Sequence, residues 1–173
     1  IVASCYTSME EFCVRFFPHV FPLPFSPLHQ EIFKILDDDY LQKAAIAAPR
    51  GIGKTSIVNC IFPIKRIVYR DSGYIIPISA TGEAAIEQSE EVKEELITNE
   101  DLLAVFGVMK PEDRLDPFGQ KEWVTQTGCK VKPRGAGQQV RGRKYKHQRP
   151  DLIIVDDLED DESVESEEQR AKL

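Results

Sequence analysis

The ten residues AAPRGIGKTS (residues 47–56) contain the end of a phosphate-binding loop. The full pattern is G-x-x-x-x-G-K-[ST], and Gly53, Lys54 and Thr55 match its last three positions. Ala48 stands where the pattern has its first glycine. Alanine is acceptable there because that position lies where a strand gives way to the loop. The stretch is therefore a candidate phosphate site, and the alternative is a helix start after a glycine-rich turn.

Each residue type in this loop has a chemical reason to be there. Gly51 and Gly53 permit the backbone conformations that turn several N–H groups toward one anion, and the helix N-terminus adds its positive dipole end. Lys54 would add a charge at the β- and γ-phosphates, and Thr55 would bind Mg²⁺ through its hydroxyl. Arg50 could reach the γ-phosphate as a catalytic group or pair with an acidic neighbour. The nucleotide-binding candidates of the loop are Pro49, Arg50, Gly51, Ile52, Gly53, Lys54, Thr55 and Ser56.

The stretch DLIIVDDLEDD (residues 151–161) supplies the acidic groups that a nucleotide site needs. Its apolar residues predict a central strand, and Asp156 follows them directly, where it would hold Mg²⁺ or one of its waters. Asp157 and Glu159 are candidates for the catalytic carboxylate that polarises the attacking water. Asp157 must lie just past the strand to share the site, because adjacent strand residues point to opposite sides. Glu159 has the longer reach but lies further along the loop, and residues 160–162 are typical of a solvated acidic loop.

The net charge of -7 hides a strong asymmetry along the chain. Residues 130–149 contain eight basic and no acidic side chains, whereas residues 156–168 contain nine acidic and no basic ones. The basic stretch could contact phosphates. Arg141 and Arg143 lie within it in a glycine-containing loop. That loop could place an arginine finger on a neighbouring subunit's γ-phosphate, contact DNA, or simply be solvated.

The length of 173 residues and the ordinary composition suit one soluble globular domain. No apolar run reaches the roughly 18 residues of a membrane span, so no membrane partner is expected, and the start does not resemble a signal peptide. The cysteines form no C-x-x-C pair, which favours buried, reduced thiols and a cytosolic compartment. The histidines have no ligand spacing, so no zinc site is expected.

Helical patterns alternate with apolar strand patterns along the chain. We expect an irregular, aromatic- and proline-rich arm over residues 1–28 and one domain over residues 29–173. Strands are expected at residues 43–48, 73–79, 122–127, 128–132 and 151–155. Helices are expected at residues 29–40, 55–68, 81–96 and 99–106, with a last one from near Ser163 or Ser166. Thr81 can cap the helix over residues 81–96. Residues 107–121 should be a loop and 135–137 a flexible link.

Two prolines qualify these expectations. Pro63 should bend or end the helix that contains it, and Pro77 weakens the assignment of its segment as a central strand. The alternation of helices with buried apolar strands nevertheless predicts an α/β domain with a mostly parallel central sheet.

Together these segments resemble the N-terminal ATPase domain of bacteriophage large terminase subunits, the DNA-packaging motors. The resemblance rests on APRGIGKTS (48–56), on ISATGEAAIEQSEEVKEEL (78–96) with NEDLLAVFG (99–107), on GQQVRGRKYKHQRPDLIIVDDLEDDE (137–162) and loosely on FSPLHQEIFKIL (25–36). It implies a three-layer P-loop NTPase fold of the additional-strand type, with ATP and Mg²⁺ as cofactors. It also implies a homo-oligomeric ring in the host cytoplasm, monomeric in isolation, that threads double-stranded DNA into a procapsid. The small terminase subunit and the portal protein are then the expected partners.

The resemblance also implies roles for single residues. Gln30, upstream of the loop, would touch adenine, although it could equally be an ordinary exposed helix residue. Arg141 is favoured over Arg143 as the arginine that acts in trans. Asp157 corresponds to the usual catalytic carboxylate, but it is shorter than the common glutamate, which leaves Glu159 in contention.

One departure from the family pattern concerns the end of the domain. The family has a further strand after the acidic motif, inserted between the two motif strands, and then a nuclease domain. This chain stops at Leu173, so we expect a domain truncated before its last core strands. We expect no nuclease activity and weak or no ATP turnover by the isolated monomer. A helicase-like or AAA-type ATPase, or a nucleotide-gated binding module without useful turnover, are the alternative functions.

Overall fold

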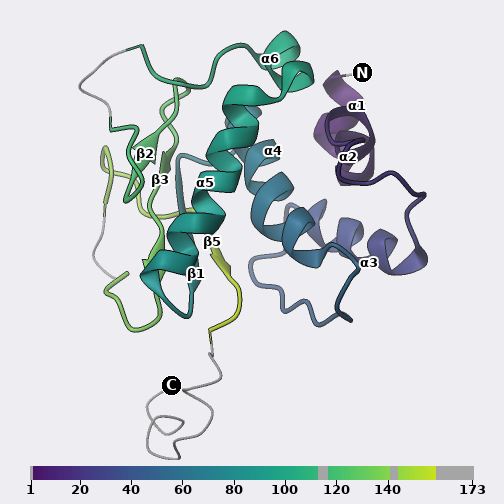
Figure 1. The fold of residues 1–173 in the computed structure, drawn as a ribbon, viewed down its shortest axis with the longest axis horizontal. Coiled ribbons are helices and arrows are strands. Elements are labelled where there is room, and N and C mark those ends of the chain that lie inside the picture. Colours follow the sequence, from purple (N-terminus) through teal and green to yellow (C-terminus); the bar gives the residue numbers. More distant parts are fainter. Residues whose placement is uncertain (1, 113–116, 141–143, 159–173) are drawn as a thin grey trace, which may run out of the picture.

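The computed structural model describes residues 2–112, 117–140 and 144–158, which form a mixed α/β fold (Figure 1). The elements in chain order are α1 (Val2–Thr7), α2 (Met9–Phe16), α3 (Pro27–Leu36), the π-helical turn η1 (Ser56–Ile61), α4 (Phe62–Val68), β1 (Tyr74–Ser79), α5 (Gly82–Thr98), α6 (Glu100–Phe106), β2 (Trp123–Val124), β3 (Lys130–Val131), β4 (Arg134–Gly135) and β5 (Leu152–Val155). The expected helix near Ser163 or Ser166 lies outside the described residues.

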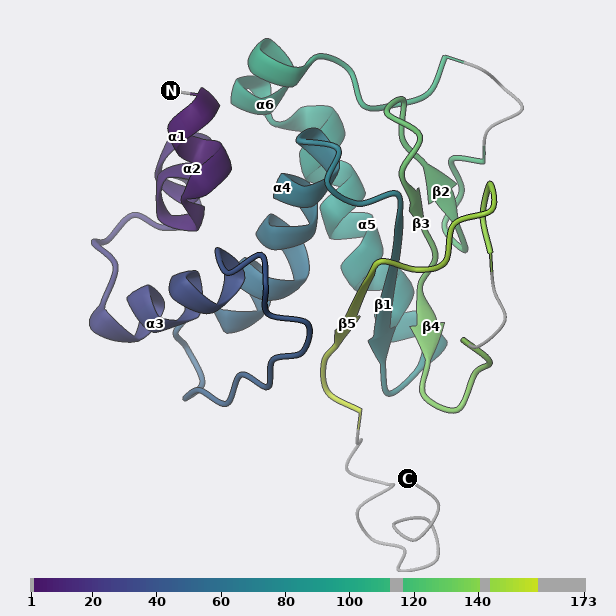
Figure 2. The same cartoon turned by 180° about the vertical axis from the view of Figure 1, so that it is seen from behind.

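The sheet is organised around β1, as Figure 2 shows. β3 and β4 run parallel to β1 along one of its edges, β5 runs parallel along the other, and β2 joins β3 in the antiparallel direction. Tyr74, Ile75 and Ile76 of β1 are almost fully buried, as expected for a strand with neighbours on both sides. The expected mostly parallel α/β sheet is therefore confirmed.

Two prolines explain why β3 and β4 are separate strands along one edge of β1. The carbonyls of Ile75 and Ser79 accept hydrogen bonds from that edge, so Pro77, which lies midway between them, faces the same way. Pro77 has no N–H to donate, and Pro133 occupies the gap between β3 and β4. Along this edge β1 pairs with β3 before Pro77 and with β4 after it. The interruption allows β1 to contain a proline and still be the central strand.

Helix α5 covers one face of the sheet and packs on β1, β4 and η1 (Figure 1). The Thr81 hydroxyl caps it by accepting the amide of Ala84 at 3.1 Å, as the sequence predicts. A Cβ on Gly135 would lie 2.5 Å from the backbone of Gly82, so the first residue of the expected flexible link (residues 135–137) belongs instead to strand β4, packed closely on this helix, and the other two form a turn. From behind, the opposite face of the sheet shows no helix among the described residues (Figure 2).

The expectation of an irregular arm is wrong for residues 2–16, which form helices α1 and α2. The side chains of Met9, Phe12, Cys13 and Phe16 follow helical spacing and are all buried in the core. Ser8 caps α2 by accepting the amide of Glu11. The prolines, which led to the expectation of irregular backbone, begin only after this helix.

The expected strand over residues 43–48 does not form. Residues 43–48 are mostly exposed, and they make no backbone hydrogen bond with the described part of the sheet. Four of the six residues are alanines, which bury little area and have low strand propensity. The outer edge of β5 is likewise unpaired among the described residues. Ile153 and Val155 of this strand are 48% and 50% exposed.

The four cysteines are all free. Cys5, Cys13 and Cys129 are buried and Cys60 is half-buried, in agreement with the expected reduced thiols. Burial raises the pKa of Cys13, Cys60 and Cys129 to about 12, which keeps them protonated and poorly nucleophilic. No helix in the described part of the chain is both long and apolar enough to cross a bilayer.

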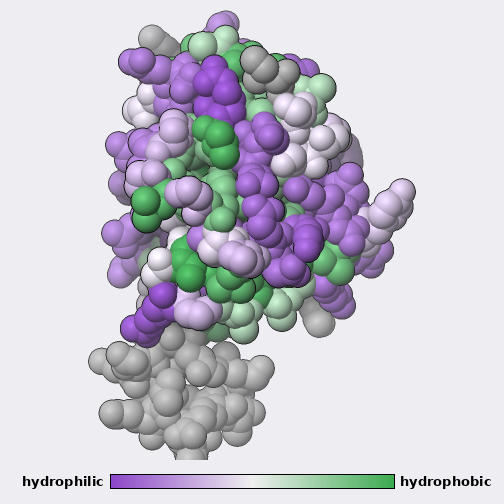
Figure 3. All heavy atoms as spheres, turned by 90° about the vertical axis from the view of Figure 1, so that its right-hand side faces the viewer, coloured by the Kyte–Doolittle hydropathy of each residue, from purple (hydrophilic) through white to green (hydrophobic). Residues whose placement is uncertain are grey.

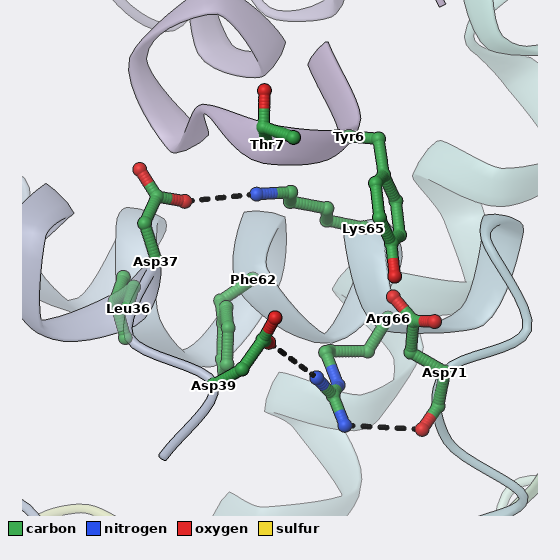
Figure 4. Close-up of a pocket in the computed structure, with 9 residues that line it drawn as sticks. All are labelled: Tyr6, Thr7, Leu36, Asp37, Asp39, Phe62, Lys65, Arg66 and Asp71. Carbon is green, nitrogen blue, oxygen red and sulfur yellow. Dashed lines mark hydrogen bonds and ion pairs between the residues drawn. The ribbon is translucent and has the colours of Figure 1, made fainter. Parts of the chain in front are cut away.

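An ion pair ties the N-terminal helices to α4. The carboxylate of Asp37 accepts the amide of Met9 at 2.8 and 2.9 Å and lies 2.9 Å from Nζ of Lys65, whose side chain is only 7% exposed. Figure 4 shows this pair at a small cavity, where the guanidinium of Arg66 also bonds the carbonyl of Asp71. On the side of the molecule where α1, α2 and α3 lie, the outer surface consists of hydrophilic residues interspersed with small hydrophobic groups (Figure 3).

Removing the Asp37 carboxylate should destabilise the protein strongly. We expect Asp37→Ala to lower the free energy of unfolding by about 3 kcal/mol, because the buried Lys65 ammonium loses its counter-charge. The measurement is denaturant unfolding at neutral pH. Glu31→Ala removes the partner of Lys34 from an exposed pair on the same helix, and it should cost less than about 1 kcal/mol. Equal effects of the two substitutions would contradict the assignment.

A second ion cluster joins the segment before β2 to β3. Hydrogen bonds from Lys132 and then Lys130 hold the pKa of Glu122 below its ordinary value of 4.5. A lowered folded-state pKa stabilises the fold above 4.5, and this contribution disappears as the pH falls through the folded-state pKa. Glu122→Gln should therefore reduce stability at neutral pH, and its difference from wild type should shrink in acid. Unfolding curves over this pH range test the prediction, and a constant difference would refute it.

Candidate functional site

The two candidate motifs meet where β5 ends and the helix that includes η1 and α4 begins. Nζ of Lys54 lies 3.2 Å from Oδ1 of Asp156, and the Thr55 hydroxyl lies 3.4 Å from Oδ2 of the same carboxylate. Asp156 is the first residue after β5 and is only 8% exposed. The lysine and hydroxyl of the phosphate-loop pattern are therefore brought together with the acidic residue from the other motif.

The backbone of the loop takes the conformation that its glycines permit. Gly51 and Gly53 have φ of +85° and +74°, in the left-handed region that other residues rarely adopt. The carbonyl of Gly53 accepts the amide of Ile57 at 2.9 Å, and helical structure runs without a break from Lys54 to the end of α4. Left-handed residues directly before a helix N-terminus are typical of an anion-binding loop.

His29, on α3, supports this loop and was not identified from the sequence. Its Nδ1 accepts the amide of Ser26 at 2.9 Å, so the proton of the neutral ring lies on Nε2. Nε2 then donates to the carbonyl of Ile52 at 2.7 Å, within the loop. The ring of Phe21 also lies against the loop, 3.1 Å from where a Cβ on Gly53 would stand. The hydrogen bond from His29 keeps the Ile52 carbonyl turned toward the protein. This orientation favours a loop whose N–H groups point outward, toward an anion.

Asn59, on η1, contributes the shortest hydrogen bond to the acidic group. Its Nδ2 donates to Oδ2 of Asp156 at 2.6 Å, and both residues are 8% exposed. The sequence contained a signal for this contact, because Asn59 is the one amide in the apolar run IVNCIF (residues 57–62), four residues after Thr55. Asp156 thus faces three donors, namely an ammonium, a hydroxyl and an amide.

The side chains at this point suit Mg²⁺ and a polyphosphate. One carboxylate and one hydroxyl provide the hard oxygen ligands that Mg²⁺ prefers, and Mg²⁺ usually takes its remaining ligands from phosphates and water. Among the described residues, no group of three or more His, Cys, Asp or Glu side chains could hold a metal by itself. Asp156 and Thr55 would therefore hold the ion only together with a bound phosphate.

Several predicted residues are placed away from this contact or at its margin. Arg50 is exposed and has no hydrogen bond or ion pair with any residue that the structure describes. Asp157 lies past the end of β5 with an exposed side chain and a φ of +42°, and its carbonyl accepts the amide of Ala80. Gln30 donates to Glu10 of α2 at 2.8 Å, so its contact with adenine stays a prediction. Arg141, Arg143 and Glu159 lie outside the described residues.

Comparisons of the chain with protein-family models, with curated proteins and with solved structures gave no match. The described residues define an α/β protein in which a glycine-containing loop and a buried carboxylate meet at the end of a parallel strand.

The support from His29 can be tested with a variant that keeps its ring packing. We expect His29→Phe to weaken binding of a non-hydrolysable Mg-ATP analogue about fivefold, because one hydrogen bond to the loop contributes about 1 kcal/mol. Fluorescence titration measures the affinity. His19→Phe is the matched control, since His19 is exposed and pairs with Glu95 of α5. An affinity unchanged by His29→Phe would contradict the supporting role.

Proposed function

We propose that this chain is the ATPase domain of a viral DNA-packaging motor, a bacteriophage large terminase subunit. The observation that carries the ATPase part is the contact of Lys54 and Thr55 with Asp156, which joins residues about one hundred positions apart. A loop with left-handed glycines precedes the lysine, and an apolar parallel strand presents the carboxylate. This combination suits a phosphate chain and its cation better than a structural ion pair alone.

The proposed roles follow from exposure and charge. Lys54 is 31% exposed, so its ammonium can exchange Asp156 for the β- and γ-phosphates. Thr55 and Asp156 would hold Mg²⁺, which neutralises charge on the phosphates when bound. Asp157, just past the strand, or Glu159 would orient the attacking water by accepting its hydrogen bond. Arg50 is unpaired among the described residues and can therefore turn toward the γ-phosphate.

The proposed DNA-packaging role rests on the resemblance and on the exposure of part of the basic stretch. Lys144 and Arg149 are exposed, so part of the basic stretch is available for DNA phosphates. Lys130 and Lys132, in contrast, are paired with Glu122. Arg141 is the proposed arginine finger for a neighbouring subunit of the ring.

The unpaired outer edge of β5 also fits an additional-strand domain. The resemblance implies a further strand between the two motif strands. β5 has a free edge among the described residues, and residues 43–48 lack a strand partner there. Insertion of a strand between these two segments would satisfy the backbone groups of both. The three-layer fold remains part of the same proposal.

Substitution of the loop lysine tests the ATPase proposal. We expect Lys54→Ala to weaken Mg-ATP binding by this chain more than tenfold, because the charge-assisted contact with phosphate is lost. It should also abolish hydrolysis stimulated by double-stranded DNA in the assembled motor. Lys34→Ala, on the exposed surface of α3, is the matched control and should leave both unchanged. Equal binding and hydrolysis by Lys54→Ala and wild type would refute the site.

The same experiment separates the alternative functions. Tight Mg-ATP binding without hydrolysis in the assembled motor would favour a nucleotide-gated binding module. Hydrolysis stimulated by single-stranded DNA but not by duplex would favour a helicase-like ATPase.

A further inference from the structure

Asn59 donates a short hydrogen bond to Asp156. Asn59 belongs neither to the phosphate-loop pattern nor to the acidic motif, so neither motif explains this contact. We propose that Asn59 is a positioning residue, which holds the Asp156 carboxylate in the orientation that binds Mg²⁺. This inference rests on the proposed function, because it concerns the metal of the same nucleotide site. It concerns the affinity for the metal and does not require Asn59 to touch the nucleotide.

The three donors to Asp156 differ in what else they can bind. Lys54 is partly exposed at 3.2 Å and Thr55 lies at the long distance of 3.4 Å, so both can turn to phosphate or metal. Asn59 is buried, and among the described residues its side-chain amide donates to Oδ2 of Asp156 at 2.6 Å. Leaving a buried amide without a partner is costly, so this hydrogen bond should persist when the other two are exchanged.

An amide donor also suits a metal-binding carboxylate electrostatically. An ammonium beside Asp156 would repel Mg²⁺, whereas the neutral amide of Asn59 adds no charge. By occupying Oδ2, Asn59 leaves Oδ1 available once Lys54 has moved to the phosphates. Hydrogen-bonded partners of ligating carboxylates commonly fix ligand orientation, and their loss weakens metal binding about 10- to 100-fold.

The helical turn that carries Asn59 has an unusual geometry with an identifiable cause. An α-helix would bring the ring of Pro63 against the carbonyl of residue 59, and proline has no N–H to donate to it. In the structure, Ser56–Ile61 form a π-helical turn, and the amide of Phe62 bonds the carbonyl of Ile57. The helix therefore continues past Pro63, and Asn59 lies one turn from Thr55, so both side chains reach the same carboxylate. Turns of this kind are frequent at functional sites.

The test is the Mg²⁺ dependence of binding of a fluorescent, non-hydrolysable ATP analogue by the whole chain. We expect Asn59→Leu, which keeps the volume but removes the donor, to raise the half-saturating Mg²⁺ concentration at least tenfold. Binding of the analogue without Mg²⁺ should change less than twofold. Asn59→Ser, which retains a donor, should recover part of the Mg²⁺ affinity.

A control separates positioning from a general loss of stability. Asn99→Leu removes another side-chain amide, which caps α6 away from the site, and it should lower stability without moving the Mg²⁺ midpoint. If Asn59→Leu does not fold, as judged by circular dichroism, Asn59→Ser supplies the test through its weaker Mg²⁺ affinity. A wild-type Mg²⁺ midpoint in the folded Asn59 variant would overturn the proposal.

The outcome with Lys54→Ala distinguishes failure of this inference from failure of the proposed function. If Lys54→Ala loses the analogue while the Asn59 variant keeps the wild-type Mg²⁺ midpoint, only the positioning role is wrong. If Lys54→Ala binds the analogue as wild type does, the assignment of the nucleotide site is wrong, and the proposed role of Asn59 is then also refuted.

Discussion

The carboxylate of Asp156 is the group on which the candidate site depends. It is buried at the end of β5, and a buried carboxylate is costly unless hydrogen-bond donors and positive charge surround it. Lys54, Thr55 and Asn59 meet that need from one helix. The same contacts hold the helix and the glycine-containing loop before it against the sheet, so an electrostatic requirement of the fold also assembles the candidate site.

The N-terminal helices support the loop from its other side. Asp37 joins α2, α3 and α4 through the amide of Met9 and the ammonium of Lys65, which fixes α3 relative to the helix that follows the loop. α3 in turn presents His29 to the carbonyl of Ile52. A segment expected to be an irregular arm is thus part of the core and reaches the site through α3.

The sequence predicted the elements whose signal is local and strong. Apolar β-type runs predicted β1 and β5, and the Thr81 cap with its helical pattern predicted α5. The sequence-based assignments were wrong where strand pairing or packing determines the structure, because an apolar pattern along the chain cannot show whether a strand has a partner. Residues 43–48 form a short apolar run but have no strand partner among the described residues, whereas β4 is short and glycine-containing and forms only because α5 and β1 enclose it. In α2, helical periodicity was hidden by the prolines that follow it.

The sequence by itself determined which groups are available for chemistry, namely a glycine-containing loop with Lys54 and Thr55 and an acidic residue after an apolar strand. Residue type and spacing along the chain are sufficient for this, since the loop conformation is local. Only the tertiary structure decided that Asn59 and His29 complete the surroundings of the loop and of Asp156. Their contacts span 97 and 23 residues, and such distances are closed by packing of the sheet and helices rather than by any pattern along the chain.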